Sequence, residues 1–512
     1  MRERTLAERA SRAGRRLVWW VVGVAAVLLL GLVLWAGTEG PSARLDKPVA
    51  VVGKSTPTSL TIEAGRSGLA RWEIRLRDDG GRSATLAEED VPRSGLFGSS
   101  VRSRHVDVNI DSQAAGFSEG PATLEVWASD HRPLAGWGGT GLVFEQPITI
   151  DLTPPRLVVL GGQHHVRRGG SDAVLYQVDA DAETSGVKIA DFFFPGVPLA
   201  EAPAGSRLAI YAIPHDVGPE SSPELVARDA AGNQATARFP VQRKERKFPT
   251  ETLEISDDFL NRKVPDLLRE NQLPVPENLV DGYLVVNRDL RKRSEQRLKE
   301  ITASSAPTAL FQEAFLQQRG SQVRSAFAQD RTYRHGGAVI DQQRHLGYDL
   351  ASTKQAPVVA ANAGKVAYVG PLGIYGNTVV IDHGLGLATL YAHLSSSEVT
   401  AGQDVTRGQE IARTGETGLA GGDHLHFSIL LRGVHVDPVE WWDAHWLRDH
   451  VQTPIAEARG GGTASVASQA AAPQAAAPQP GAPDAAAPPA GAPQAAAPQA
   501  ALPAAAPRVA AP

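Results

Sequence analysis

The sequence contains no cysteine among its 512 residues and only one methionine. The lack of cysteine excludes disulfide bonds, thiolate metal sites and a cysteine nucleophile. Any transition metal that the chain binds must therefore be held by histidine and carboxylate side chains. A chain without cysteine suits an oxidising compartment, although cytosolic proteins of this composition also occur.

A large excess of charge of either sign is also absent. The formal net charge is -5 and the isoelectric point is near 6.3, which gives no electrostatic basis for binding nucleic acid. We therefore expect no nucleic-acid partner. A chain of 512 residues is too long for one hydrophobic core, so its length predicts three or four domains.

Long hydrophobic runs are absent except for one near the N-terminus. Residues 17–37 carry no charge and are numerous enough to cross a bilayer as a helix. Six arginines and two glutamates precede the run within residues 1–16, and no basic cluster follows it. This asymmetry predicts a single-pass anchor in the inner (cytoplasmic) membrane, with residues 1–16 in the cytoplasm and the bulk of the chain in the periplasm. The alternative is a cleaved signal peptide, but the run is long for one and no A-x-A site follows it cleanly.

Mainly β structure is predicted between residues 45 and 242, where apolar residues alternate in short segments between clusters of Gly, Pro, Asp and Ser. These segments are 60–62, 70–76, 123–128, 157–160, 173–178 and 224–239. The pattern predicts two β-sandwiches, 45–152 and 153–242, separated at the prolines 154 and 155. The turn at 227–233 loosely resembles one in bacterial immunoglobulin-like domains. We expect spacers or docking modules for protein partners, with carbohydrate binding as the alternative.

Residues 250–320 change to a helical pattern. Ser256, followed by two aspartates, is a candidate N-cap for a helix with an apolar stripe at Leu260, Val264, Leu267 and Leu268. Pro265 is expected to kink or break that helix. Residues 289–301 and 308–316 also read as helical. We expect a connecting helical layer, with a regulatory arm over a neighbouring site as the alternative.

The C-terminal segment, residues 459–512, consists mostly of Ala, Pro, Gln and Gly, and repeats the phrase QAAAPQ. Such a composition cannot bury enough apolar surface to offset the entropy of ordering the chain. We therefore expect this tail to be disordered.

Histidines are concentrated after residue 330, where nine of the fourteen lie between His335 and His450. His345 is followed four residues later by Asp349. In an extended strand these two would face the same way, and Gly347 between them would leave room for an ion. A neutral imidazole and a carboxylate oxygen are ligands that zinc accepts, although this spacing alone is weak.

Two further segments place histidines at strand-like spacing. His424 and His426 would share one face of a strand, with Leu425 and Phe427 on the other face. Residues 389–394 read as a strand that ends with a histidine, His393. Two imidazoles directed at one place are costly to bury unless something holds them, and a metal ion is the usual holder.

Together these segments resemble the lysostaphin-type (LytM-like) zinc metallopeptidases. The resemblance runs over about residues 321–442 and includes the connecting segments 360–366, 376–384, 405–409 and 415–418, and the sequence Val436-Asp437-Pro438. It implies a small, mostly antiparallel β domain at 321–445 with an open groove over one Zn²⁺ ion.

The resemblance also implies roles for five residues. His345, Asp349 and His426 would be the metal ligands, which leaves a fourth position for water. His393 and His424 would flank this water as catalytic residues, one accepting its proton and the other stabilising the oxyanion. The sequence does not decide which histidine is the base.

The remaining histidines of this region fit no ligand spacing. We expect His383 to be structural, His335 to face solvent at the border of the groove, and His435, His445 and His450 to lie on the surface. Some family members carry a tyrosine a few residues beyond the third segment, where this chain has residues 395–398, Ser-Ser-Ser-Glu. Oxyanion stabilisation would then fall to the histidines.

The resemblance implies a zinc metalloendopeptidase that hydrolyses stem peptides or cross-links of peptidoglycan. A domain held outside the cytoplasmic membrane without a wall-binding SH3-like domain fits a D,D-endopeptidase better than one that cleaves glycine bridges. The alternative is a non-hydrolytic wall-binding regulator of other hydrolases, because some members have lost ligands. This chain retains all five residues. A third possibility assigns the function to the sandwich units.

Overall fold

The computed structural model describes residues 14–15, 17–28, 31, 40–65, 67–92, 101–131, 140–200 and 202–460, all within the first of two compact units, 1–466 and 467–512. Residues 17–28 are helical. Among the described residues, no helix combines the length and the apolar character needed to span a bilayer. Parts of the expected anchor at 17–37, most of the basic segment 1–16 and the tail from 461 lie outside the described residues.

The first sandwich consists of two sheets packed around one core. One sheet has the order β1 (Ser42–Leu45), β3 (Thr56–Glu63) and β6 (Ser103–Ile110). The other has the order β2 (Val51–Val52), β8 (Gly141–Ile150), β7 (Gly120–Asp130), β4 (Leu69–Asp78) and β5 (Ser83–Asp90). Apolar residues of both sheets, among them Leu60, Ile74 and Leu124, form the buried core between them, as alternating strands require.

The second sandwich consists of two four-stranded sheets. One has the order β14 (Val197–Pro198), β15 (Ser206–Ala212), β11 (Ser171–Val178) and β9 (Leu157–Leu160). The other has the order β13 (Phe192–Pro195), β12 (Ala182–Ile189), β16 (Glu224–Asp229) and β17 (Gln234–Ala237). Two further strands, β10 (His164–Arg167) and β18 (Val241–Lys244), form a separate parallel pair, which brings the beginning and the end of this part of the chain together.

The segments predicted as strands from the sequence lie in strands of these sheets, so the mainly β prediction is confirmed. The segment 224–239 is divided, because the chain turns at 230–233 between β16 and β17. A further strand, β18, follows these two. The immunoglobulin-like assignment of both sandwiches stays a prediction.

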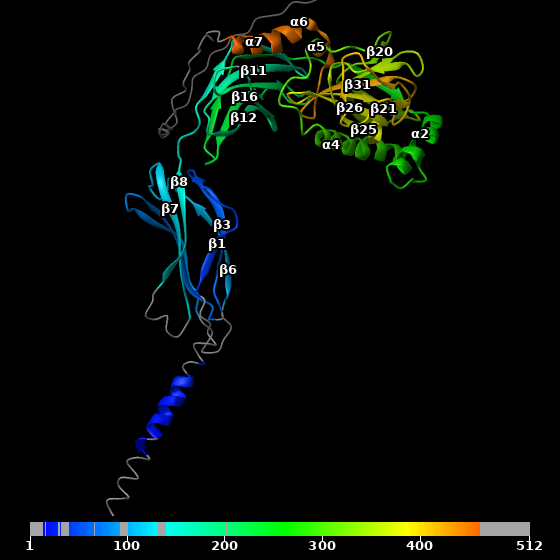
Figure 1. Ribbon diagram of the computed structural model, residues 1–512. Helices are drawn as coiled ribbons and strands as arrows, with labels where there is room; N and C mark the ends of the chain where they lie inside the picture. The colour runs from blue at the N-terminus through cyan, green and yellow to red at the C-terminus, as the bar shows by residue number, and fades with distance from the viewer. Residues whose placement is uncertain are drawn as a thin grey trace, which may run out of the picture. The chain divides into compact units, whose positions relative to one another are not determined.

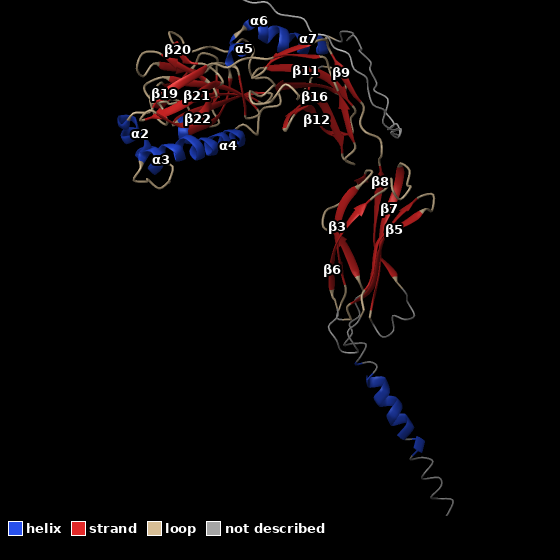
Figure 2. Cartoon of the chain, turned by 180° about the vertical axis from the view of Figure 1, so that it is seen from behind, coloured by secondary structure: helices blue, strands red, loops and turns tan. Residues whose placement is uncertain are grey.

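The helical layer consists of α2 (Asp257–Glu270), α3 (Leu279–Leu284), the π-helix η2 (Val285–Leu290) and α4 (Arg291–Ile301). The Ser256 hydroxyl caps α2 by accepting a hydrogen bond from the Phe259 amide, as the sequence predicts. The predicted stripe is also confirmed, because Leu260, Val264, Leu267 and Leu268 are its buried residues. Figures 1 and 2 show α2 and α4 beside the C-terminal β domain.

Two expectations for residues 250–320 were wrong, and of the two outcomes expected at Pro265 the break does not occur. The region begins with a strand, β19 (Thr250–Glu254), that pairs in parallel with β21 (Gln329–His335). Helix α2 runs through Pro265 without a break. Residues 308–316 form no helix, because tertiary bonds hold them extended: the Leu310, Phe315 and Leu316 amides donate to carbonyls of residues 383, 441 and 361.

The C-terminal β domain contains three sheets. The largest has the order β20 (Gln322–Ser325), β23 (Tyr348–Ala351), β31 (Leu425–Leu431), β27 (Leu387–Ala392), β26 (Asn377–Gly384), β25 (Gly364–Pro371) and β29 (Asp404–Val405), with β32 (Val434–Val436) paired to β31. A second contains β19, β21 and β22 (Ala338–His345). The third contains β24 (Pro357–Val359), β30 (Glu410–Arg413) and β28 (Ser396–Ser397). The predicted mostly antiparallel arrangement is confirmed, with β19–β21 the parallel exception.

The helical layer covers the face of the large sheet that carries His426. Residues paired across an antiparallel ladder share one face, and Ala392 pairs with His426 while Leu390 pairs with Ser428. Ala392 and Leu390 pack in one core with residues of α2, α3 and α4. Leu425 and Phe427 point to the opposite face, into a second core. The expected alternation along β31 is therefore confirmed.

This second core is shared with the second sandwich. It contains residues of β11, β12 and β15 together with residues of the large sheet. The chain then continues into α5 (Pro438–Trp442), α6 (Ala444–Leu447), the π-helix η4 (Arg448–Gln452) and α7 (Thr453–Arg459), and α7 lies against β11 (Figure 1). The Asp437 amide donates a 2.8 Å hydrogen bond to the Gly169 carbonyl, so the backbones of both parts are joined directly.

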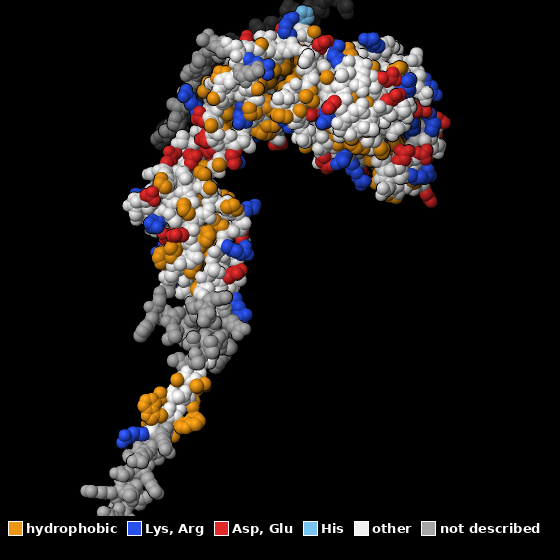
Figure 3. All heavy atoms as spheres, in the orientation of Figure 1, with side chains coloured by type: hydrophobic (Ala, Val, Ile, Leu, Met, Phe, Trp, Pro, Cys, Tyr) orange, Lys and Arg blue, Asp and Glu red, His pale blue; other side chains and the backbone are white. Residues whose placement is uncertain are grey.

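Acidic and basic side chains are interspersed on the face of residues 153–460 that Figure 3 shows. No continuous field of one sign is visible on this face among the described residues. The distribution agrees with the small net charge of the chain, and gives a polyanion no basic surface here to bind.

Candidate metal centre

Three side chains expected to bind metal converge in the structure. His345 Nε2, Asp349 Oδ1 and His426 Nδ1 lie 3.0 Å from one another in each of the three pairings. All three residues are buried, with 4 to 9 % of their surface exposed. They form a group of ligand atoms close enough to hold one ion.

Two strands and a short link between them position these ligands. His345 is the last residue of β22, and Asp349 lies in β23, where it pairs directly with His426 of β31. The expectation of one extended strand from 345 to 349 was wrong, because β22 and β23 belong to different sheets and the chain bends at 346–347. The bend still directs both side chains to one point.

Gly347 makes room for a ligand rather than for the ion itself. A Cβ at this position would meet the Ser428 Oγ at 2.5 Å and the His426 Nε2 at 2.6 Å. These two atoms hydrogen-bond each other at 3.0 Å. A side chain at 347 would therefore displace the His426 ring or break its hydrogen bond.

The second ring nitrogen of each ligand histidine is held by a hydrogen-bond acceptor. His345 Nδ1 lies 3.2 Å from the Ala326 carbonyl, and His426 Nε2 lies 3.0 Å from Ser428 Oγ. The Ser428 hydroxyl donates its own hydrogen to the Leu346 carbonyl at 2.7 Å, so its oxygen accepts from the imidazole. These bonds select the tautomers that leave His345 Nε2 and His426 Nδ1 free to bind metal.

The two expected catalytic histidines flank the ligand group. The His393 ring centroid lies 4.9 Å from that of His424 and 5.8 Å from that of His426. His424 Nε2 lies 3.4 Å from Asp349 Oδ1. The Nδ1 atoms of His393 and His424 are each 2.8 Å from a backbone carbonyl, of Thr417 and Gly422, so Nε2 is the ring nitrogen left for the centre.

His393 follows the end of β27, as the sequence predicts, and has a backbone φ of 62°. A non-glycine residue in this left-handed region costs about 1–2 kcal/mol. Its amide donates to the Tyr375 carbonyl, and the Leu394 amide donates to the Asn377 carbonyl. These bonds hold the backbone in the conformation that directs the imidazole at the other histidines.

The electrostatics keep the ligand histidines neutral. Burial lowers the pKa of His345, and lowers that of His426 to about 4. Burial and the neighbouring His424 and His426 hold the pKa of His393 well below its usual value. Burial alone would raise the pKa of Asp349, but His345 and the hydrogen bonds from the histidines hold it well below its usual value. The group therefore offers two neutral imidazoles and a carboxylate.

These residues fit a divalent transition-metal ion. Zinc with tetrahedral bonds of about 2.0–2.1 Å separates its ligand atoms by about 3.3 Å, close to the spacing found. The hydrogens of the His345 and His426 rings lie on Nδ1 and Nε2, where they are donated to Ala326 and Ser428. The three atoms that face one another therefore carry only lone pairs, which repel unless a cation lies between them. The donor set, two imidazoles and one carboxylate, is one that catalytic zinc sites use.

Three residues around the centre were not found from the sequence. Arg331 donates from Nη2 to Asp349 Oδ2 at 2.8 Å, Ser428 orients His426, and the Tyr375 ring lies 5.4 Å from the His426 ring. Ser428 continues the alternation of the His424–His426 strand, which was an available signal. Arg331 and Tyr375 reach the centre only through tertiary packing and carry no such signal.

The other histidines divide into two groups. His383 is structural as expected, since its ring nitrogens bond the Ala363 carbonyl and Thr389 Oγ1. His335 is half-buried, and bonds the Ile255 carbonyl rather than solvent alone. The prediction that the last three histidines lie on the surface holds for His445, which is exposed. It is wrong for His435, which is buried and bonds Glu295, and for His450, which is half-buried and bonds Asp172.

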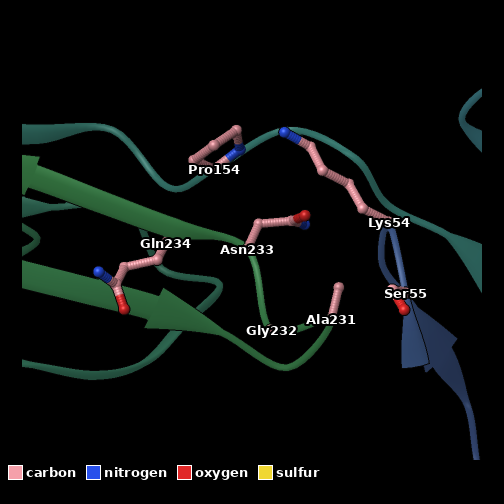
Figure 4. A pocket seen from close by; sticks show the side chains of 7 residues that line it. All are labelled: Lys54, Ser55, Pro154, Ala231, Gly232, Asn233 and Gln234. Carbon is pink, nitrogen blue, oxygen red and sulfur yellow. The ribbon is translucent and has the colours of Figure 1, made fainter. Parts of the chain in front are cut away.

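A separate pocket lies at the turn between β16 and β17 (Figure 4). Lys54 and Ser55 line it from the segment before β3, and Pro154 and residues 231–234 complete its wall. Its polar groups are one ammonium, one hydroxyl and two amides. This lining contains no carboxylate or imidazole, so it offers neither a general base nor a metal ligand.

Comparison with known proteins places the centre in a family. Residues 343–438 match the family described as Peptidase family M23. The chain is 41 % identical over 95 residues to "DD-carboxypeptidase/endopeptidase Mpg" of Neisseria meningitidis, covering 19 % of this chain and 22 % of that one. It is 40 % identical over 119 residues to "Peptidoglycan DD-endopeptidase ShyB" of Vibrio cholerae, covering 23 % and 27 %.

Among solved structures, the chain is similar to a putative peptidase M23 from Pseudomonas aeruginosa, with 24 % identity and a TM-score of 0.33. That match covers 53 % of this chain and 93 % of the other. The chain spans only about a quarter of the length of the curated relatives named above. The shared part contains all five residues singled out in the sequence.

Proposed function

Because residues 343–438 are a peptidase M23 domain, we propose that this chain is a zinc-dependent endopeptidase that hydrolyses peptide cross-links of peptidoglycan. The convergence of His345 Nε2, Asp349 Oδ1 and His426 Nδ1 at 3.0 Å carries the proposal. Relatives named DD-endopeptidases support peptidoglycan as the substrate, and D,D-cross-links as the bond.

The residues divide the chemistry between them. His345, Asp349 and His426 would hold the ion, which when bound would lower the pKa of a coordinated water towards 7. His393 and His424 both leave Nε2 for the centre. Burial and the neighbouring histidines keep the pKa of His393 low, so its Nε2 is unprotonated. Burial alone would lower the pKa of His424, but Asp349 raises it above its usual value, so His424 can carry a proton to donate. One imidazole accepts the proton of the attacking water, and the other donates a hydrogen bond to the oxyanion and a proton to the leaving amine.

Digestion of purified peptidoglycan by the full chain, followed by mass analysis of the fragments, tests the proposal. We expect the wild type to release cross-linked stem peptides as monomers, and a chelator to stop the release. The His424→Ala variant should bind zinc as the wild type does, with a turnover lowered by about 10²-fold or more. His445→Ala, which removes an exposed histidine outside the centre, is the matched control.

A different outcome would support a regulator instead. If the wild type and His424→Ala both bind peptidoglycan and neither releases fragments, the chain is a non-hydrolytic wall-binding protein. Fragments released equally by both variants would place the hydrolytic centre elsewhere.

We further propose that residues 17–37 anchor the chain in the inner membrane with its bulk in the periplasm. The uncharged run and the six preceding arginines support this orientation. Reporter fusions after residue 45 should be active only with a periplasmic reporter. Activity of a cytoplasmic reporter at the same position would contradict it.

A further inference from the structure

The two carboxylate oxygens of Asp349 have different neighbours. Oδ1 lies within 3.0 Å of both ligand nitrogens, whereas Oδ2 accepts a 2.8 Å hydrogen bond from Arg331 Nη2. The same Nη2 donates to Ser325 Oγ at 2.6 Å. The guanidinium is thus tied between a strand of the large sheet and the carboxylate, and only 15 % of its side chain is exposed.

A strand outside the family match supplies a carboxylate close to the Arg331 guanidinium. Glu251 of β19 pairs with Arg331 of β21 in the parallel ladder, and its Oε2 lies 3.5 Å from Arg331 Nε. Glu251, Ser325 and Arg331 all precede residue 343, where the M23 match begins. Part of the surroundings of the centre therefore comes from the segment that leaves the second sandwich.

We propose that Arg331 is a positioning residue that keeps Asp349 a one-oxygen ligand of the metal ion. This inference rests on the proposed function of the centre. A buried carboxylate whose Oδ2 is bound to a guanidinium can offer only Oδ1 to the ion. Without Arg331, Oδ2 is a buried anionic oxygen, and the nearest available cation is the metal itself. The carboxylate would then bind through both oxygens and occupy the position that water needs.

A second arginine on the same strand shows that pairing with a glutamate of β19 does not by itself bring an arginine into contact with a metal ligand. Arg334 faces Glu254 in the same ladder, with 3.6 Å between Nε and Oε1. Its side chain is 41 % exposed, and Glu254 is 63 % exposed. Such a pair is a surface ion pair that contributes little. The inner pair differs because it is buried and reaches a metal ligand.

Cobalt(II) bound to the full chain in place of zinc reports the coordination number directly. A four-coordinate cobalt ion absorbs visible light much more strongly than a five- or six-coordinate one. We expect the wild type to give the strong spectrum, and Arg331→Gln to lower its absorptivity by about threefold or more. Arg331→Lys, which keeps a cationic donor for Oδ2, should retain most of the intensity.

Arg334→Gln is the matched control, since it removes the same kind of pair and leaves Asp349 untouched. A folded Arg331→Gln protein with the wild-type spectrum would overturn the inference and leave the proposed function intact. If that variant does not fold, Arg331→Met, which keeps the apolar stem of the side chain but offers no donor to Oδ2, must weaken the spectrum instead, and an unchanged spectrum overturns the inference. A wild type that binds no cobalt or zinc would refute the proposed function itself.

Discussion

At the residue scale, the centre depends on which nitrogen of each imidazole carries its hydrogen. Each of the four histidines has one nitrogen bonded to a carbonyl or hydroxyl oxygen, which leaves the other nitrogen for the centre. A hydrogen bond worth about 1 kcal/mol is enough to populate one tautomer mainly. The acceptors are thus part of the chemistry, although they touch neither substrate nor metal.

Gly347 gives a direct test of this dependence. In Gly347→Ala the new Cβ must displace either the His426 ring or the Ser428 hydroxyl, each less than 3 Å away. We expect the affinity for zinc to fall roughly 10- to 100-fold, as for other losses of a ligand's supporting hydrogen bond. Competition with a chromogenic chelator measures this affinity.

Gly421→Ala is the control for this substitution. An added Cβ at Gly421 meets nothing within 4 Å, although the residue lies only three positions before His424. It should bind zinc like the wild type. Equal affinities of Gly347→Ala and the control would show that the His426–Ser428 bond is dispensable.

The five expected site residues could be found because each belongs to a short segment with recognisable spacing. The course of the backbone between these residues could not be predicted. The HxxxD spacing suggests one strand, but His345 ends β22 and Asp349 belongs to β23. Arg331 could not be identified, because it reaches Asp349 across two different sheets, and β19, the strand that pairs with its own strand, lies far earlier in the sequence.

At the element scale, helix α4 makes hydrogen bonds to residues on the face of the large sheet that carries His426. Glu295 of α4 accepts hydrogen bonds from the Tyr375 hydroxyl at 2.6 Å and from His435 Nε2 at 2.9 Å. The Tyr375 ring in turn contacts His426. Burial alone would raise the pKa of Glu295, but His435 and Tyr375 lower it to about 2.

This pKa predicts how α4 responds to acid. Because the folded value of about 2 is below the unfolded value of 4.5, Glu295 stabilises the fold fully above pH 4.5. That stability, roughly 3 kcal/mol, is lost as the pH falls from 4.5 towards 2. Glu295→Gln should unfold more easily at pH 7 and lack this share of the acid dependence.

Chemical denaturation at several pH values measures the effect. Glu300→Gln, an exposed position on the same helix, is the control and should follow the wild type. Parallel curves for the wild type and Glu295→Gln between pH 7 and pH 3 would contradict the assigned pKa.

Helices and strands were predicted well where the local sequence pattern determines them. They were predicted poorly where contacts with distant residues determine them. The Ser256 cap and the stripe of α2 follow from local rules that the structure retains. Residues 308–316 have a helical pattern, yet Phe311 and Phe315 are drawn into the shared core and their neighbours bond distant carbonyls. No local signal reports such bonds.

At the scale of the whole molecule, the second sandwich and the C-terminal β domain share buried polar contacts as well as a core. The Glu440 carboxylate accepts from the Ser171 amide at 2.8 Å, and Trp441 Nε1 donates to Ser171 Oγ at 3.1 Å. His450 bonds Asp172 at 2.9 Å. A fragment of residues 320–450 would expose these groups, so assays are best made on the full chain.

Glu440 makes the stability of this junction depend on pH between 4.5 and about 7. Burial raises its pKa from 4.5 to about 7, so its contribution to stability is complete below pH 4.5 and is lost as the pH rises through 7. The hydrogen bond to Asp172 raises the pKa of His450, whose contribution is also lost on the alkaline side. We expect this junction to contribute less to the stability of the wild type at pH 8 than at pH 5.

Glu440→Gln should remove most of this difference and be more stable than the wild type at pH 8, by roughly 3 kcal/mol. The amide resembles the protonated acid and still accepts from Ser171. Calorimetry at both pH values checks this, with the exposed Glu457→Gln as the control. A Glu440→Gln protein less stable than the wild type at pH 8 would mean that the carboxylate is paired rather than merely buried.

The packing of the last helices on the second sandwich has a consequence for biogenesis. Residues 153–242 leave the ribosome well before Leu447, Val451 and Ala458, which are buried only in the finished protein. During synthesis the part of β11 that receives α7 stays uncovered for about 275 residues, from Val178 to Thr453. This apolar surface therefore has to be kept from aggregating until α7 has been made.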